Sequence, residues 1–245
     1  MENSENKSLI STGSSNLAKT EKLLSITQKI LSEIKPQYES VRIGNQEWMT
    51  RNLDVDRFRN GDLVTHIESD EDWEKAGQNK QPAWCYYDND PENGKKYGKL
   101  YNWFAVNDPR GLAPEGWHVP SDDELTSLVE FLGGKAIAGY KMKSVEGWEV
   151  WEDQDGVLQN GNGDNSSGFN GLPGGSRNFD GSFNGIRLHG IRLHATLWSA
   201  TEVDDDDAWS RFLNSSYGSV YRGTAIGYTF NYGKSVGASV RCLRD

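Results

Sequence analysis

Residues 120–134, PSDDELTSLVEFLGG, contain the clearest helix signal in the 245-residue chain. Ser121 is a favourable N-cap residue, and Glu124 stands three positions later, so the two complete a capping box at the start of a helix. The glycine pair 133–134 supplies the stop signal at the other end. This stretch therefore predicts a helix over residues 121–132.

The segments before this helix are short and separated by turns. VRIGNQEWMTRNL (41–53) predicts a β-hairpin with its turn at Gly44–Asn45. GKLYNWFAV (98–106) places three large apolar residues at helical spacing. It predicts a second helix over residues 97–106.

The segments after the helix are rich in glycine, asparagine and serine, so mainly loops are expected there. Strands are predicted near the end of the chain, at residues 208–213, 219–222 and 238–245. Together these elements predict one α+β domain over residues 39–245. Its expected buried side chains are Trp117, Leu125, Leu128, Phe131, Trp198, Trp209, Leu213 and Val220.

The N-terminal region differs in composition from the rest of the chain. Residues 1–16 are polar and rich in serine and asparagine, which is typical of a disordered tail. Residues 17–38 form a helix and linker in our interpretation, with leucines at heptad-like spacing and Pro36 ending a helix over 17–35. Such a helix packs on its own domain or joins a homo-oligomer, and the sequence leaves both open.

The net charge and the hydropathy of the chain argue against several classes of function. The formal net charge is −10, which argues against a nucleic-acid partner and against docking on anionic membranes. No apolar run is long enough to span a membrane, and no signal peptide is visible, so we expect synthesis in the cytoplasm and no membrane insertion. The protein then stays in the cytoplasm or joins a virion or its tail.

The chain has two cysteines, Cys85 and Cys242, which are too few for a disulfide scaffold. We expect two buried thiols, and a mutual disulfide remains the alternative. No cysteine or histidine cluster has the spacing of a zinc site.

Six phrases occur in order along the chain: VRIGNQEWMTRNL, PAWCYYDNDPENGKKYGKLYNWFAV, GLAPEGWHVPSDDEL, GFNGLPGGSRNFDGSF, LWSATE and SVRCLRD. Together they resemble the Fibrobacter succinogenes major paralogous domain, a family related to C-type-lectin-like and formylglycine-generating-enzyme folds. The resemblance covers roughly residues 39–245. It implies a C-type-lectin-like fold with two helices, a small twisted antiparallel sheet and long Gly-rich loops.

Within that domain, residues 198–245 resemble the variable region of proteins that retroelements diversify. In such systems a reverse transcriptase misincorporates opposite template adenines, so asparagine codons scatter over an alphabet without Glu, Lys, Gln, Met or Trp. Between residues 203 and 233, all 25 positions outside six frame residues keep to this alphabet. The frame residues are Ala208, Trp209, Arg211, Leu213, Val220 and Arg222. We call the other 25 positions the filler residues.

The order of frame and filler residues is the stronger signal. In a strand, alternate residues share a face, so Trp209, Arg211 and Leu213 are expected to face the core, opposite the filler. Fourteen of the 25 filler residues are Tyr, Ser, Gly or Asn, which antibody paratopes also favour. The expected ligand-binding residues are Val203, Asp204, Asp205, Asp206, Asp207, Ser210, Phe212, Asn214, Ser215, Ser216, Tyr217, Gly218, Ser219, Tyr221, Gly223, Thr224, Ala225, Ile226, Tyr228, Phe230, Asn231 and Tyr232.

Other chemistries have weaker signals. Four consecutive aspartates at 204–207 suit a solvated loop better than a cation site, and the calcium-loop pattern that starts at Asn160 has glycine at its twelfth position. The two cysteines do not match the reactive pair of the oxidase relatives. We therefore expect a non-enzymatic binder of a protein or glycan receptor, with no cofactor and no metal. A fixed-ligand adhesin, a structural paralogue and an ordinary polar loop remain the alternatives.

Overall fold

The computed structural model describes residues 17, 19–26, 38–183, 191–224 and 233–245, and the chain divides into two compact units, residues 1–38 and 39–245. In the first unit, residues 19–26 are helical, within the predicted helix. The predicted disordered tail lies outside the described residues. None of the described helices combines the length and the hydropathy that a membrane crossing requires.

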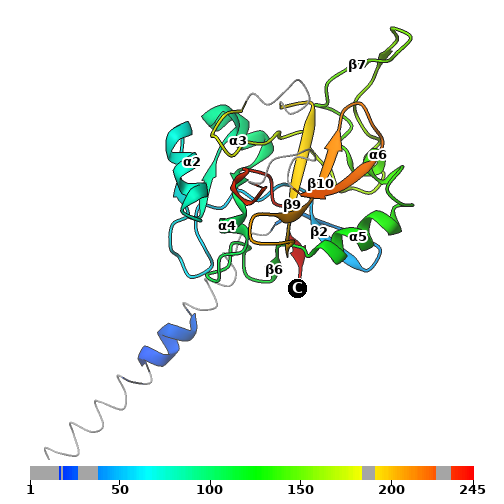
Figure 1. The fold of residues 1–245 in the computed structure, drawn as a ribbon. Helices are drawn as coiled ribbons and strands as arrows, with labels where there is room; N and C mark the ends of the chain where they lie inside the picture. Colours follow the sequence, from blue (N-terminus) through cyan, green and yellow to red (C-terminus); the bar gives the residue numbers. More distant parts are fainter. Residues whose placement is uncertain (1–16, 18, 27–37, 184–190, 225–232) are drawn as a thin grey trace, which may run out of the picture. The chain divides into compact units, whose positions relative to one another are not determined.

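The second unit is mixed α+β, with several small sheets and short helices (Figure 1). The helices are α2 (Asp70–Gln78), α3 (Pro91–Tyr97), α4 (Trp103–Val106), α5 (Asp122–Phe131) and α6 (Ala138–Met142), with 3-10 turns η1 (Tyr87–Asn89) and η2 (Gly233–Ser235). The first strands are β1 (Ser40–Ile43), β2 (Gln46–Met49), β3 (Thr65–His66), β4 (Ala83–Cys85), β5 (Leu100–Tyr101) and β6 (Trp117–His118). The later strands are β7 (Trp151–Glu152), β8 (Leu158–Gln159), β9 (His194–Glu202), β10 (Ala208–Asn214), β11 (Val220–Thr224) and β12 (Leu243–Arg244).

The sheet that matters for the candidate site has the order β11-β10-β9. Both pairings are antiparallel, and β10 lies in the middle, with Leu213 opposite Val220 on one side and opposite Ala195 on the other. In Figure 1, β9 and β10 run beside each other through the unit, with α2 and α3 on one side and α5 and α6 on the other. A second sheet, β1-β2-β12-β6, joins the N-terminal hairpin to the end of the chain.

The main hydrophobic core joins α5 to the three-stranded sheet. Leu125 and Leu128 of α5 pack in one cluster with Leu197 of β9, Leu213 of β10 and Val220 of β11. Most of the predicted core is confirmed, because Trp117, Leu125, Leu128, Trp198, Leu213 and Val220 are all buried.

Two core predictions need correction. Phe131 is 65% exposed, because it lies beside the buried stripe of α5 and its ring covers the turn of the β1–β2 hairpin. A Cβ placed on Gly44 of that turn would stand 3.0 Å from the Phe131 ring. Trp209 is half-buried, because its ring contacts the guanidinium of Arg222, whose side chain is 47% exposed.

The capping box of α5 is present as predicted, and the β1–β2 hairpin turns at Gly44–Asn45. The predicted helix over residues 97–106 is confirmed only over α4, and the earlier part of the prediction is wrong. Gly98 ends α3 with a φ of 76°, and Asn102 begins α4 by accepting a hydrogen bond from the backbone N–H of Ala105. The residues between these caps form β5 instead of a helix.

The late strands agree only in part with the prediction. β10 and β11 correspond to the strands predicted at residues 208–213 and 219–222. The third predicted strand, 238–245, is regular only in β12, and Ala238 and Ser239 form isolated bridges. The longest strand, β9, was not predicted, because its buried residues continue over both faces and give no alternation.

Candidate functional site

The β10–β11 hairpin is fastened to α5 by a cluster of charged side chains. Asp122 at the start of α5 accepts hydrogen bonds from Arg211 Nη1 at 2.6 Å and from Arg222 Nε at 2.9 Å. Arg211 also donates to the Thr126 hydroxyl at 2.7 Å. The Arg222 guanidinium lies 3.3 Å from the centre of the Trp209 ring. The frame arginines of the sequence are thus structural anchors.

The charge of Asp122 is stabilised in this cluster. Burial alone would raise the pKa of its carboxyl, but hydrogen bonds from Arg222 and Arg211 outweigh burial and hold the pKa below its usual range. Asp122 and Arg211 are both buried, so the pair depends on this mutual compensation.

The turn after β10 is held through hydrogen bonds to its main-chain carbonyl groups. Lys143 is buried, and its Nζ donates to the carbonyl oxygens of Asn214 at 3.1 Å and Tyr217 at 3.0 Å, and also to Gly161 at 2.6 Å. Desolvation lowers the pKa of Lys143 to about 8. These hydrogen bonds need only a backbone carbonyl, which every residue type has. They therefore do not depend on which side chains the turn residues carry.

Further main-chain hydrogen bonds hold the same turn from three directions. The Ser215 N–H donates to the Leu193 carbonyl at 2.8 Å, and the Val220 N–H donates to the Lys135 carbonyl at 2.8 Å. The Gly218 carbonyl accepts from the N–H of Tyr140 on α6 at 2.8 Å. The backbone of residues 214–220 is therefore fixed without the use of its outward side chains.

Two tyrosines stand exposed on this fixed backbone. Tyr217 is 55% exposed and Tyr221 is 48% exposed, and their rings meet edge to face with 6.1 Å between centroids. Tyr140 of α6 is also exposed, and its backbone N–H is bonded to the turn at the Gly218 carbonyl. We call Tyr140, Tyr217 and Tyr221 the aromatic patch.

Tyr140 was not among the predicted site residues. It lies more than 60 positions before Val203, the first of them, and the contact of α6 with the turn brings it there. The available signal was Gly139, where a Cβ would stand 2.5 Å from the Ser219 carbonyl oxygen. A glycine at such a position indicates a close backbone approach.

Three predicted binding residues do not face solvent. Ser210 and Asn214 are buried because β10 carries buried residues on both faces, and Ser215, which directly follows the strand, is buried as well. Ser210 donates to the Gly223 carbonyl, and the Asn214 side chain accepts from the Ser216 N–H. Phe212 is half-buried and stacks on His194 with 5.3 Å between centroids. The expected strict alternation of core and solvent faces is therefore wrong for β10.

The remaining predicted residues divide into three groups. Val203 and Asp204–Asp206 are exposed in the turn between β9 and β10, and Asp207 is half-buried. Ser216, Gly218 and Ser219 are half-buried in the β10–β11 turn, and Gly223 and Thr224 are half-buried at the far end of β11. Ala225, Ile226, Tyr228, Phe230, Asn231 and Tyr232 lie outside the described residues.

Metal-ligating side chains are not clustered in the part of the chain that the structure describes. Over the described ranges, no three or more His, Cys, Asp or Glu side chains converge as metal ligands would. Both cysteines are buried and unpaired, which decides between the two alternatives left by the sequence. Burial raises the pKa of each thiol to about 12, so both stay protonated and unreactive near neutral pH.

One protein family matches most of the chain. The Fibrobacter succinogenes major domain matches residues 41–244, which is most of the chain and the whole of the α+β unit except its ends. The protein therefore belongs to the Fibrobacter succinogenes major domain family, as the six phrases predicted. No curated protein and no solved structure matches the chain.

Proposed function

We propose that this protein is a non-enzymatic binder of C-type-lectin-like fold, whose C-terminal surface is diversified by a retroelement through adenine mutagenesis. It recognises a protein or glycan receptor and is displayed on a virion or tail, or acts in the cytoplasm. The exposed tyrosines of the β10–β11 hairpin provide the main contacts, because aromatic residues dominate interface hot spots.

One observation carries the proposal. The turn at residues 214–220 is held through main-chain atoms by Lys143, Leu193, Lys135 and Tyr140, while the side chains of Tyr217 and Tyr221 are exposed. A surface that must accept many sequences needs this separation, because exposed substitutions then change stability by only about 0.5 kcal/mol or less.

The division of labour between residue types supports the same function. The anchors of the hairpin are Arg211, Leu213 and Val220, which are buried, and Arg222, which pairs with Asp122. All four belong to the frame. Exposed filler residues such as Tyr217 combine a large contact area with a polar hydroxyl, which suits recognition of changing partners.

Reading the DNA that flanks the gene tests the mechanism. We expect a near-identical repeat beside a reverse-transcriptase gene, differing from this gene almost only where the repeat has adenine. The codons of Trp209, Leu213 and Val220 can be written without mutable adenines, so they should match between the copies. A flank without such a repeat would contradict diversification and leave a surface with one fixed ligand.

A measurement of the assembly state separates this function from a structural role. A structural paralogue would cover the aromatic patch with a neighbouring subunit, whereas a binder presents the patch to solvent. Sedimentation of the full chain, repeated with Tyr217→Ser and Tyr221→Ser, distinguishes the two. An assembly that dissociates when both tyrosines are replaced would contradict the receptor-binding proposal.

A further inference from the structure

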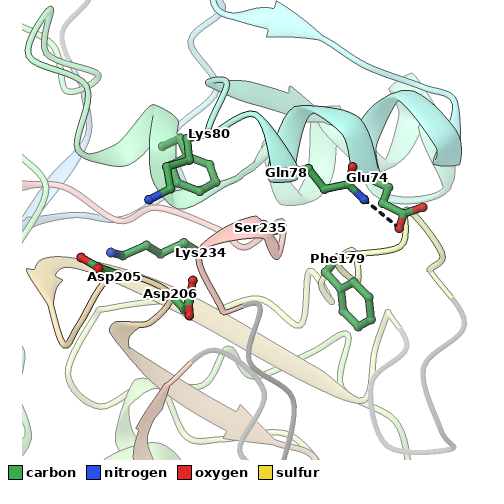
Figure 2. Close-up of a pocket in the computed structure, with 10 residues that line it drawn as sticks. Glu74, Gln78, Lys80, Phe179, Asp205, Asp206, Lys234 and Ser235 are labelled. Carbon is green, nitrogen blue, oxygen red and sulfur yellow. Dashed lines mark hydrogen bonds between the residues drawn. The ribbon is translucent and has the colours of Figure 1, made fainter.

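A pocket of about 360 Å³ lies at the opposite end of β10 from the aromatic patch, beside the β9–β10 turn. Figure 2 shows Glu74 and Gln78 of α2 on one side of this space and Asp205 and Asp206 of the β9–β10 turn across from them. Phe179 adds an aromatic side chain to the wall. Asp205 and Asp206 are predicted ligand-binding residues, and the other residues that line this pocket were not predicted.

The walls of the pocket are fixed before any ligand arrives. A Cβ on Gly77 of α2 would stand 2.6 Å from the hydroxyl of Ser235, so α2 and η2 are in direct contact. Trp73 strengthens this contact by donating from Nε1 to the Ser235 carbonyl at 3.0 Å. On the other side, the Lys234 N–H donates to the Asp206 carbonyl at 2.9 Å. The turn is therefore tied to η2 through the main chain.

Three carboxylates (Glu74, Asp205 and Asp206) and two amines (Lys80 and Lys234) line the pocket, so its net charge is negative by one. Lys234 does not offset the turn carboxylates, because its Nζ is bound to Glu202 at 2.6 Å and to the Asp204 carbonyl. Asp205 and Asp206 are exposed, and their side chains remain available to a ligand. Burial, together with the charges of Asp204 and Asp206, raises the pKa of the neighbouring Asp207 carboxyl.

We propose that this pocket binds a basic side chain of the receptor, a guanidinium or ammonium group on an aliphatic stem. Phe104 and Phe179 are half-buried and provide apolar and π surface for the stem and the cation. Asp205 and Asp206 provide the countercharge at the rim. The pocket has room for one such side chain, and a neutral or acidic group would leave both carboxylates without a partner.

The receptor in this inference rests on the proposed function, but the preference for a cation can be measured without a receptor. The probe is N-acetyl-arginine methylamide, titrated calorimetrically into the full 245-residue chain at low ionic strength. Its uncharged counterpart is N-acetyl-norleucine methylamide. We expect the arginine compound to bind about tenfold more tightly, because only it pairs with the carboxylates.

Two double variants with equal net charge locate the site. Asp205→Asn with Asp206→Asn should weaken arginine binding about tenfold, whereas Glu130→Gln with Asp155→Asn should leave it unchanged, because these exposed residues lie on other elements. Equal affinity for the two probes, or equal binding by the two double variants, would overturn the proposal. Such a failure would leave the aromatic patch and its function untouched, since the patch is tested with other residues.

Discussion

The two sides of the β10–β11 hairpin follow different rules. On the inner side, Arg211 and Leu213 are buried, and each contacts defined partners. Arg211 is paired with the buried Asp122 of α5, and Leu213 packs in the main hydrophobic core. On the outer side, Tyr217 and Tyr221 are about half exposed, and the main chain beneath them is fixed by Lys143 and by neighbouring carbonyl and amide groups. The difference teaches that a surface can be free to vary when its backbone is held by atoms that every residue type carries.

The largest effect on stability is expected at the buried ion pair between Asp122 and Arg211. Asp122→Ala removes the only carboxylate that the described contacts give to buried Arg211. An unpaired buried charge costs about 3–5 kcal/mol, so the free energy of unfolding should fall by about 3 kcal/mol or more. Urea denaturation measures it. Asp123→Ala, next to it and exposed, is the matched control and should change stability by about 0.5 kcal/mol or less.

A somewhat smaller effect is expected at the support of the turn. Lys143→Met keeps the aliphatic volume but leaves the carbonyls of Asn214, Tyr217 and Gly161 without this donor. Unsatisfied buried groups cost about 1–3 kcal/mol, and the loss should appear in denaturation at pH 7. A fully stable variant would mean that the Lys143 amine is not needed to hold the turn.

The same variant gives a test by pH. Burial lowers the pKa of Lys143 from 10.5 to about 8, so between these pH values the unfolded chain binds more protons than the folded chain. The contribution of this amine to stability therefore increases as the pH rises through that window. The destabilisation by Lys143→Met should grow from pH 8 to pH 10, because the buried thiols and tyrosines titrate in both proteins and cancel. A constant difference would contradict the lowered pKa.

The smallest effect on stability is expected on the outer side. Tyr217→Ser and Tyr221→Ser remove two rings that are about half exposed and contact each other. Each replacement should shift the free energy of unfolding by about 0.5 kcal/mol or less, as measured by denaturation. A loss of several kcal/mol would show that these rings belong to the core and not to a recognition surface.

The sequence predicted elements whose determinants are local. The capping box of α5 and the Gly44–Asn45 hairpin need only a few neighbouring residues, and both were predicted correctly. β9 was missed because its signal depends on burial by segments far away in the chain. For the same reason the frame and filler pattern located the β10–β11 hairpin, but it could not predict that Ser210, Asn214 and Ser215 are buried. The pattern also could not include Tyr140, which joins the surface through α6.

A pair of display libraries tests most directly the separation of the filler residues from the residues that support the hairpin. In one library, codons that adenine mutagenesis can reach replace those at Ser216, Tyr217, Ser219, Tyr221 and Thr224. In the other, the same codons replace those at Asp122, Lys143, Arg211, Leu213 and Val220. The fraction of clones that survive protease challenge measures folding. We predict that most clones of the first library survive and very few of the second do. Equal survival of the two libraries, or collapse of the first, would contradict the account.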